Sequence, residues 1–295
     1  MSKKNWALGL RVCALFLVLA TVCAAEVPRS IVGEVGHYNS VPGEDLLDIA
    51  FKHRLAIDHL TFANHWPQTA TRIYPNTPVL IPNLRVLPKS PPRDGIVVNL
   101  PERILYFFRG GQLSETLPLS IGAPGKHETP SGQFHVVEKV VDPIWYPPAW
   151  SDLKGPVGPG PDNPLGDRWI GLSAPRYGIH GTYQPVNVGH NVTHGCLRAY
   201  PRMLREFFPK VEVGMPVRLD YETVKLGKTS SGKLCLLSYP DAYKKSDPVK
   251  RAKKIAAAYG YTLNPEQIQN IDDCTGLPVW LNGDPDSANG EGSSS

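Results

Sequence analysis

Short apolar runs separated by turn residues make up the middle of the 295-residue chain, and many of them alternate or are rich in β-branched residues. Such runs are typical of strands that bury one face. Strands are expected at residues 96–108 (two strands around a turn), 116–121, 132–141, 169–173, 178–180 and 216–221, with one helix at Pro201–Phe208. Many short strands with turns between them predict a mainly β domain of the sandwich or barrel type.

Nearer the N-terminus the pattern is helical between two short strands. Gly43 supplies a turn, and beyond it Leu46 and Ile49 fall on one apolar face of a helix. A second short helix is expected at Ala56–Ala63, followed by a closing strand at Val79–Pro82. This order of elements predicts a small βααβ module that precedes the β domain.

The remaining segments are separated by changes in composition. Three prolines between residues 85 and 94 indicate a stiff linker. Beyond residue 221, a strand-like run at Lys233–Tyr239 precedes two helices that open at Asp247-Pro248 and Asn264-Pro265. The expected organisation is a signal segment (1–25), the βααβ module (26–84), the linker (85–94), the β domain (95–221), a mixed or helical C-terminal extension (222–282) and a disordered tail (283–295).

Residues 1–25 combine two lysines near the start, an apolar run and small residues at the end. This is the pattern of a secretory signal peptide, so we expect export and cleavage before Glu26. A lipid on Cys23 and an uncleaved membrane anchor are the alternatives. Cleavage removes 3 of the 31 basic residues and none of the 27 acidic ones, which leaves 28 against 27. So balanced a chain is not expected to bind nucleic acid.

The cysteines also bear on chemistry. Cys13 and Cys23 leave with the signal segment, and Cys196, Cys235 and Cys274 remain. An odd number of cysteines in an exported protein suggests one free thiol. Cys235 and Cys274 could form a disulfide that leaves Cys196 free, but the sequence alone does not fix this pairing.

The densest chemistry lies at residues 177–200, where three histidines and four glycines accompany Cys196. A thiol needs a base or a favourable field before it attacks a carbonyl, and a nearby histidine can supply it. The Gly195-Cys196 peptide offers backbone N–H groups where an oxyanion would form. The segment therefore indicates cysteine-based acyl transfer. Zinc ligation by the same histidines is disfavoured, because the spacing lacks paired ligands on one element.

These residues also carry a family resemblance. His180-Gly181, followed by Thr193-His194-Gly195-Cys196-Leu197-Arg198, resembles the signature of the YkuD-type L,D-transpeptidases. Two Pro- and Gly-rich segments, 129–134 and 160–166, are similar to the same family, and the likeness spans about residues 94–220. The Pro-rich stretch 143–164 is too long for a simple connection, so we expect it to border the cleft. The βααβ module resembles LysM modules over residues 38–82, which implies binding of N-acetylglucosamine-containing glycans.

The resemblance assigns three residues to the reaction itself. It implies that Cys196 is the nucleophile and that His180 is the general acid and base. The backbone carbonyl of Gly181 would orient the His180 ring in place of the acidic residue found in a serine-protease triad.

Three further residues of the same segment are candidates for supporting roles. His194 is expected to shape the site or tune the thiolate, and Gly195 to supply an oxyanion-hole N–H. Arg198 is expected either to bind a substrate carboxylate or to form a structural ion pair. The family signature does not include His190, which is interpreted as a solvated loop residue.

The implied reaction is acyl transfer on peptidoglycan in the periplasm, without a cofactor or metal. The thiolate would attack the diamino acid–D-Ala bond of a tetrapeptide stem, release D-Ala and form a thioester. The acceptor stays open: a neighbouring stem amine would give a 3→3 cross-link, a lysine would attach an outer-membrane lipoprotein, and water would make the protein an L,D-carboxypeptidase. A non-catalytic wall-binding protein is the alternative. The sequence leaves the role of the extension and the oligomeric state open.

Overall fold

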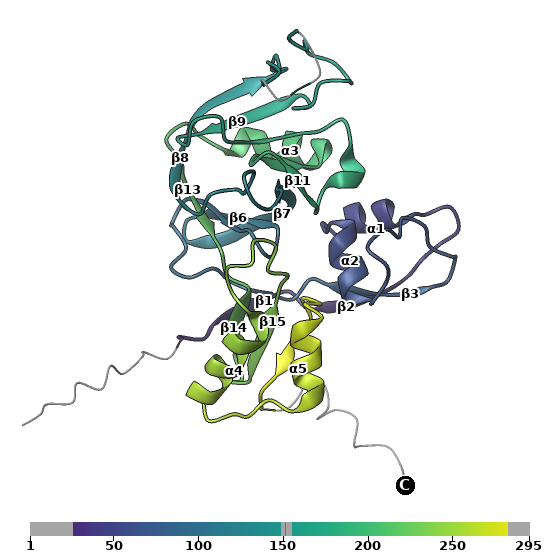
Figure 1. Ribbon diagram of the computed structural model, residues 1–295, viewed down its shortest axis with the longest axis vertical. Coiled ribbons are helices and arrows are strands. Elements are labelled where there is room, and N and C mark those ends of the chain that lie inside the picture. Colours follow the sequence, from purple (N-terminus) through teal and green to yellow (C-terminus); the bar gives the residue numbers. More distant parts are fainter. Residues whose placement is uncertain (1–25, 149–150, 152–154, 283–295) are drawn as a thin grey trace, which may run out of the picture.

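The computed structural model describes residues 26–148, 151 and 155–282. The expected signal segment and C-terminal tail lie outside these residues. Figure 1 shows a large β domain, with the N-terminal module on one side of it and a second, smaller α/β unit beneath. Within the described part of the chain, no helix is both long and apolar enough to cross a membrane.

The β domain is built on nine strands. They are β5 (Gly95–Asn99), β6 (Ile104–Arg109), β7 (Gln112–Gly122), β8 (Gly132–Val141), β9 (Arg168–Leu172), β10 (Gly178–His180), β11 (Asn191–Thr193), β12 (Leu197–Ala199) and β13 (Pro216–Asp220). Their order in the sheet is β11-β7-β12-β10-β9-β8-β13-β5-β6, and β7 also pairs with β6. Because β7 pairs with both β12 and β6, the strand pairings form a closed series. The sheet of the expected sandwich is therefore continuous through β7. The mainly β prediction is confirmed.

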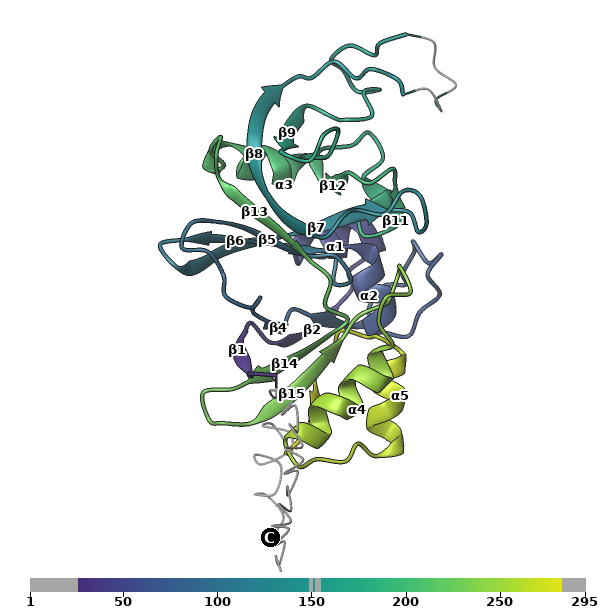
Figure 2. The ribbon, with the colours of Figure 1, turned by 60° about the vertical axis from the view of Figure 1, so that its left-hand side comes forward.

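One helix packs against these strands and contributes to the main core. α3 (Pro201–Phe207) continues into a short 3₁₀ turn, η2 (Phe208–Lys210), and a second turn, η1 (Pro185–Asn187), precedes β11. Figure 2 shows α3 held beside β8 and β9. The ring of Phe207 meets that of Phe107 on β6 edge to face, with 5.1 Å between centroids. Burial of these rings and of the inward strand residues forms the main core.

The N-terminal module has the expected order of elements: β2 (Val35–Asn39), α1 (Leu46–Lys52), α2 (Ile57–Ala63) and β3 (Pro78–Pro82), with β2 and β3 antiparallel. α1 begins where the sequence predicts, because Asp45 caps its N-terminus and Asp48 returns the hydrogen bond. Leu46, Ile49 and Leu60 are fully buried between the helices and the two strands.

The C-terminal unit contains more of the chain than the sequence suggests. Its sheet has the order β16-β15-β14-β1-β4, and two helices cover it. These elements are β1 (Arg29–Val32), β4 (Arg85–Val86), β14 (Val224–Lys228), β15 (Leu234–Ser238), β16 (Val279–Trp280), α4 (Pro248–Ala258) and α5 (Pro265–Asp272).

The expected boundaries of the N-terminal module and the linker therefore need correction. β1 lies parallel to β14, and β4, in the predicted linker, pairs with the other edge of β1. Gly227 makes this possible: a Cβ there would lie 2.6 Å from Val86 and 2.8 Å from Ile31. The N-terminal module is thus an excursion between two strands of the C-terminal sheet. The residues of that sheet lie far apart in sequence, which is why no local pattern revealed it.

A buried polar cluster joins the β domain to the C-terminal unit. The ammonium of Lys225 and the carboxylate of Glu102 form an ion pair whose side chains are both fully buried. Tyr106 donates to the same carboxylate at 2.5 Å, and Arg85 lies 3.8 Å from it. Because several donors surround the carboxylate, the charge is compensated away from water.

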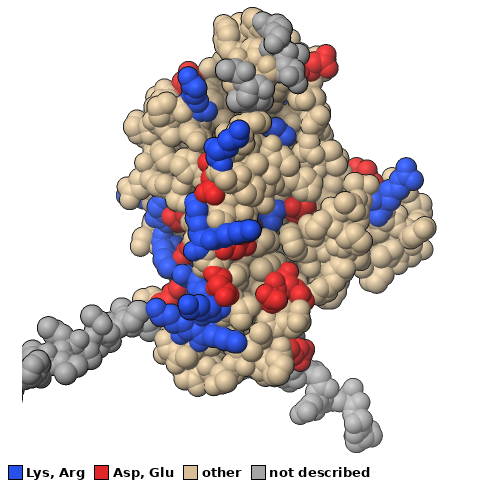
Figure 3. All heavy atoms as spheres, in the orientation of Figure 1, with Lys and Arg blue, Asp and Glu red and all other residues tan. Residues whose placement is uncertain are grey.

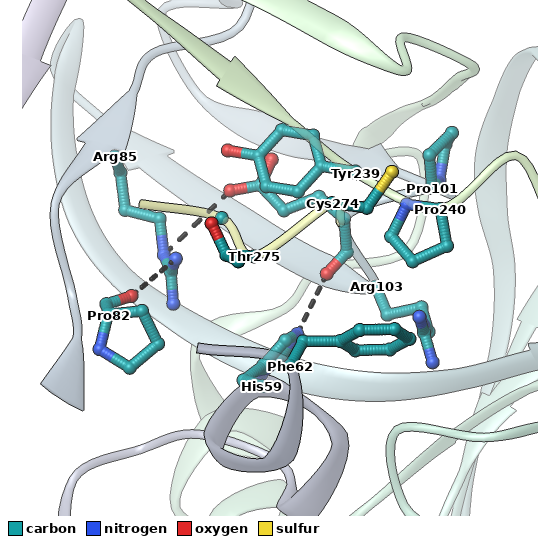
Figure 4. Close-up of a pocket in the computed structure, with 12 residues that line it drawn as sticks. His59, Phe62, Pro82, Arg85, Pro101, Arg103, Tyr239, Pro240, Cys274 and Thr275 are labelled. Carbon is teal, nitrogen blue, oxygen red and sulfur yellow. Dashed lines mark hydrogen bonds and ion pairs between the residues drawn. The ribbon is translucent and has the colours of Figure 1, made fainter. Parts of the chain in front are cut away.

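The three units meet at a small pocket beside this cluster. Figure 4 shows His59 of α2 facing Arg85 of β4, Tyr239 and Cys274. His59 donates from Nε2 to the Glu102 carbonyl at 2.9 Å and accepts from the Ala56 N–H at 3.0 Å. Burial, together with nearby arginines, lowers the pKa of His59 to about 4, so the ring is neutral. Both ring nitrogens of His59 have hydrogen-bond partners, which indicates a structural role at the junction of the three units.

The two cysteines outside the signature are free thiols in the structure, so the disulfide considered from the sequence is not formed. Cys235 is buried within β15, whereas Cys274 lies after α5 beside the pocket. Burial raises the pKa of each thiol to about 12. Both are therefore poor nucleophiles at neutral pH.

Surface charge is mixed. On the face drawn in Figure 3, Lys and Arg side chains form a band in which Asp and Glu are interleaved. Ion pairs join such groups, for example Lys89–Glu222 at 2.8 Å and Lys210–Glu115 at 2.6 Å. Charges of both signs at such short separations cancel each other's field, in keeping with the nearly balanced charge of residues 26–295.

Candidate active site

The signature residues are brought together by two neighbouring parallel strands. β10 pairs with β12 in a register that sets Ile179 opposite Leu197 and His180 opposite Arg198. Cys196 directly precedes β12 and by the same register lies level with Gly178, so the candidate nucleophile is on the strand next to that of His180 and two positions away along it. The crossover between the strands, residues 181–196, contains η1 and β11.

The thiol of Cys196 is partly buried and faces a large cavity. Its sulfur donates to the Arg176 carbonyl oxygen at a distance of 3.4 Å. Burial raises the pKa of this thiol, while the Gly178 N–H and the positive charge of Arg198 oppose that rise. The resting group is therefore a protonated thiol, and a base must remove its proton before attack.

His180 has the protonation state that a base requires. Its Nδ1 lies 2.6 Å from the carbonyl oxygen of Gly181, and because a carbonyl only accepts, Nδ1 carries the proton. Nε2 is then the basic nitrogen. Burial, with the charge of Arg198, lowers the pKa of His180 to about 4, so the ring is neutral at pH 7. Trp169 stacks on this ring, with 5.9 Å between centroids.

Two threonines fix the backbone around the thiol. The Thr193 hydroxyl donates to the Cys196 carbonyl at 2.6 Å and accepts from the Gly195 N–H at 3.1 Å. Thr129 donates to the Gly195 carbonyl at 2.9 Å. The expected oxyanion donor of Gly195 is thus engaged by Thr193 in the structure. Sequence reasoning singled out the segment containing Thr129 but gave this residue no role.

Gly195 requires glycine for two reasons. Its φ of +112° lies in a region that other residues rarely adopt. A Cβ on Gly195 would also lie 2.4 Å from the ring of Tyr177. The backbone can therefore pass closely over that ring only because no side chain intervenes.

The C-terminal extension also contributes to the site. The Tyr243 hydroxyl donates to the Gly122 carbonyl at 2.9 Å and accepts from the Thr129 N–H at 3.1 Å. Tyr243 thereby holds the segment from which Thr129 reaches Gly195. No sequence motif marks Tyr243, since the two residues that its hydroxyl contacts lie more than 100 positions away.

His194 and Arg198 differ in their surroundings. His194 is exposed at the cavity, and its ring lies 4.1 Å from that of His127. Burial and the nearby charge of His127 lower its pKa. Arg198 is partly buried, and its Nε has no hydrogen-bond partner. Within residues 26–148, 151 and 155–282, Arg198 forms no ion pair.

His190 is not a solvated loop residue, contrary to the sequence interpretation. Its Nδ1 lies 2.7 Å from the Asp58 carboxylate of α2. Arg103 reaches the same carboxylate at 2.5 Å and also donates to the Gly189 carbonyl. The loop before β11 is thereby attached to the N-terminal module, a relationship that no spacing in the sequence could reveal.

The cavity beside Cys196 has a volume of about 1310 Å³, enough for a peptide. As expected, part of the Pro-rich stretch borders it, through residues 143–148. Its other lining residues are His127, Glu138, Val140, Asp142, Leu165, Trp169, Pro175, Arg176, Tyr177 and His194. Among the described residues, no group of three or more His, Cys, Asp or Glu side chains is placed to hold a metal.

Comparison with known proteins gives consistent matches. Residues 93–219 match the family model of the L,D-transpeptidase catalytic domain, YkuD. The chain is 34% identical over 165 residues to the probable L,D-transpeptidase ErfK/SrfK of Salmonella typhimurium, over 52% of each protein. It is 30% identical over 224 residues to the probable L,D-transpeptidase YbiS of Escherichia coli K12, over 68% of this chain and 72% of the relative.

The extent of these matches varies. The chain spans about half the length of the first of these relatives. Among solved structures, the catalytic domain of the E. faecium L,D-transpeptidase aligns with 26% identity and a TM-score of 0.35, over 43% of this chain and 95% of that one.

Proposed function

Because the chain belongs to the L,D-transpeptidase family, we propose that it is a cysteine acyltransferase that acts on the peptide stems of peptidoglycan. One observation carries the proposal furthest. His180, a neutral imidazole whose Nδ1 is held by the Gly181 carbonyl, lies on the strand next to the one that Cys196 precedes. A base in that state is what a protonated, buried thiol needs.

In the first half-reaction, Nε2 of His180 takes the thiol proton and the sulfur attacks the carbonyl of the diamino acid–D-Ala bond. The negative charge that develops on the carbonyl oxygen is stabilised by the Cys196 N–H. The Gly195 N–H joins it only after it releases the Thr193 hydroxyl. The C–N bond then breaks, the imidazolium protonates the departing nitrogen, and D-Ala leaves a thioester on Cys196.

In the second half-reaction, an amine attacks the thioester. The amine nitrogen gives up a proton to His180, the C–S bond breaks, and the thiolate takes a proton back. A stem amine would yield a 3→3 cross-link, a lipoprotein lysine a protein–wall bond, and water a trimmed stem. Arg198, whose charge has no protein partner in the described residues, is assigned to the substrate carboxylate, and His194 to shaping the cavity wall. We place the reaction in the periplasm.

The test is intact-protein mass spectrometry of the protein incubated with a disaccharide-tetrapeptide. We expect an adduct equal to the substrate minus D-Ala on the wild type and on Cys274→Ala, and none on Cys196→Ala. Cys274→Ala is the matched control because it removes a different free thiol. Absence of the adduct from a folded, reduced wild type would contradict the proposal and favour a non-catalytic wall protein.

The N-terminal module is proposed to bind glycan strands, as its resemblance to LysM modules implies. Hydrogen bonds tie the segment before α1 to the loop after α2: the Ser40 hydroxyl donates to the Tyr74 carbonyl at 2.6 Å, and the Leu46 N–H donates to the Thr71 carbonyl at 3.0 Å. The Tyr74 side chain is 86% exposed there, as a ring that stacks on a sugar must be. Tyr74→Ala should weaken binding to chitin oligomers in calorimetry without changing thioester formation.

A further inference from the structure

The basic and acidic side chains around the cavity are divided between two walls. His127, Arg176 and His194 are on the wall that includes Cys196, whereas Glu138 and Asp142 stand on β8 and just beyond its end. These are the only two carboxylates among the described residues that line the cavity. The cavity can therefore hold an anionic and a cationic group at once.

A bulge in β8 aims Glu138 into this cavity. Pairing with β9 shifts register between Val136 and Glu138. Val136 is buried in the core, and Lys139 points the same way, since its ammonium lies 2.5 Å from the Val211 carbonyl. Glu138 and Val140 consequently face the opposite side and line the cavity. Without the extra residue, the alternation of a strand would turn Glu138 toward the core.

The opposite strand makes room for the carboxylate. Gly171 pairs with Glu138, and a Cβ at Gly171 would lie 2.6 Å from the Glu138 side chain. Trp169 donates from Nε1 to Oε1 of Glu138 at 2.8 Å. The other oxygen, Oε2, has no partner among the described residues. Glu138 is thus oriented by one bond and keeps one acceptor atom for a ligand.

This carboxylate is near the candidate base. The Trp169 ring that donates to Glu138 is the same ring that stacks on His180. A cation bound at Oε2 is therefore separated from His180 by the breadth of one indole. Trp145 and Tyr146 also line the cavity and offer further aromatic surface to a cation.

We propose that Glu138, together with Asp142 just beyond the end of β8, is the subsite that binds the ammonium group of the acyl acceptor. The proposal rests on the proposed function, because only a transferase needs a cationic second substrate. An alkyl amine is protonated at neutral pH. For transfer to occur, the amine must react with the thioester faster than water hydrolyses it. Bound at Glu138, it loses one proton to Nε2 of His180 or to water, and its nitrogen attacks the thioester carbonyl. The C–S bond breaks, the amide nitrogen loses a second proton, and the thiolate takes up one.

The experiment separates the two half-reactions. Glu138→Gln keeps an oxygen for the Trp169 N–H but removes the charge, and Asp142→Asn removes the other carboxylate charge that lines the cavity. Glu206→Gln alters an exposed carboxylate on α3 as the matched control. Thioester formation from tetrapeptide is followed by mass spectrometry. The thioester is then offered either a second tetrapeptide, whose side-chain amine is a cation, or hydroxylamine, which is uncharged at neutral pH. The measured quantity is the ratio of aminolysis to hydrolysis.

We expect Glu138→Gln to lower the ratio for the tetrapeptide amine by about ten- to a hundredfold, since a hydrogen bond to a charged group is lost. The ratio for hydroxylamine and the rate of thioester formation should stay within about twofold of the wild type. Equal losses for both nucleophiles would show that Glu138 acts only by positioning Trp169 and His180, and would overturn the proposal, as would an unchanged tetrapeptide ratio. A wild type that forms no thioester would instead overturn the proposed function.

Discussion

The Asp58 carboxylate of the N-terminal module lies 2.7 Å from Nδ1 of His190, three residues before the Thr193 that braces Cys196. Arg103 of the β domain contacts the same carboxylate, and the side chains of Asp58 and Arg103 are 6% and 4% exposed. The loop that leads to the proposed nucleophile is therefore clamped between two units. The N-terminal module thus has a structural role in addition to any binding of glycan.

Asp58→Asn should loosen this clamp. It leaves the Arg103 guanidinium buried without a counter-charge, which we expect to cost about 3 kcal/mol of the free energy of unfolding. Calorimetry measures the loss, and amide hydrogen exchange should show faster exchange in α2. Glu206→Gln, which affects an exposed pair with Arg202, is the control and should change stability by less than about 0.5 kcal/mol. Equal effects of the two variants would contradict the clamp.

The same pair predicts a dependence on pH. Burial alone would raise the pKa of Asp58, but the hydrogen bond to His190 and the charge of Arg103 lower it below its ordinary value. A lowered pKa in the folded state stabilises the protein above the ordinary carboxyl pKa, and this contribution disappears as the pH falls through the folded value. The difference in stability between wild type and Asp58→Asn should therefore shrink below about pH 4. A difference that is independent of pH would exclude this ionisation as its source.

The reactivity of Cys196 should increase with pH through the neutral range. Burial raises the pKa of Cys196, and burial of His180 lowers the pKa of that ring to about 4, so the resting pair is uncharged. Alkylation by iodoacetamide, followed by mass spectrometry, should accelerate continuously from about pH 7 to about pH 9. The other two thiols, with pKa values of about 12, serve as internal controls and should stay unmodified. A plateau between about pH 5 and pH 7 would indicate a thiolate–imidazolium pair instead.

Gly195→Ala should abolish most thioester formation. The new methyl group would meet the ring of Tyr177 at 2.4 Å and displace the backbone N–H groups beside the thiol. Loss of one oxyanion donor typically costs about a hundred- to a thousandfold in rate. Gly125→Ala is the matched control, because Gly125 also has a positive φ, of +84°, but has open space at its Cβ. If both variants lost activity equally, backbone strain and not the contact with Tyr177 would be responsible.

The Glu102–Lys225 pair should couple the β domain to the C-terminal unit. Lys225→Met leaves a fully buried carboxylate with its closest charge removed, which is expected to cost about 3–5 kcal/mol. In the double variant with Glu102→Gln, part of that loss should return, because neither charge then remains buried alone. Chemical unfolding of the four proteins measures the coupling. Strictly additive losses would show that the two residues act independently.

Much of this protein could be predicted from local sequence. The helix that follows Asp45, the helix at residues 57–63 and the strands around the signature coincide with the structure, because capping, turn residues and apolar periodicity act over a few positions. The arrangement of the signature residues also follows largely from local sequence. His180, Gly181 and the segment ending at Arg198 lie on two adjacent strands and the single crossover that joins them, so their spacing carries most of the geometry.

The rest depends on contacts between distant segments, which no periodicity encodes. Only the tertiary structure places β1 beside β14, sets His190 against Asp58, and brings Tyr243 to Thr129. It also decides that Thr193 engages the N–H of Gly195, and that a bulge turns Glu138 to the cavity. Each of these outcomes depends on register, burial and the satisfaction of buried polar groups, which are properties of the packed chain. The sequence by itself determined most elements of the N-terminal module and the β domain and the candidate nucleophile, whereas packing decided what surrounds them.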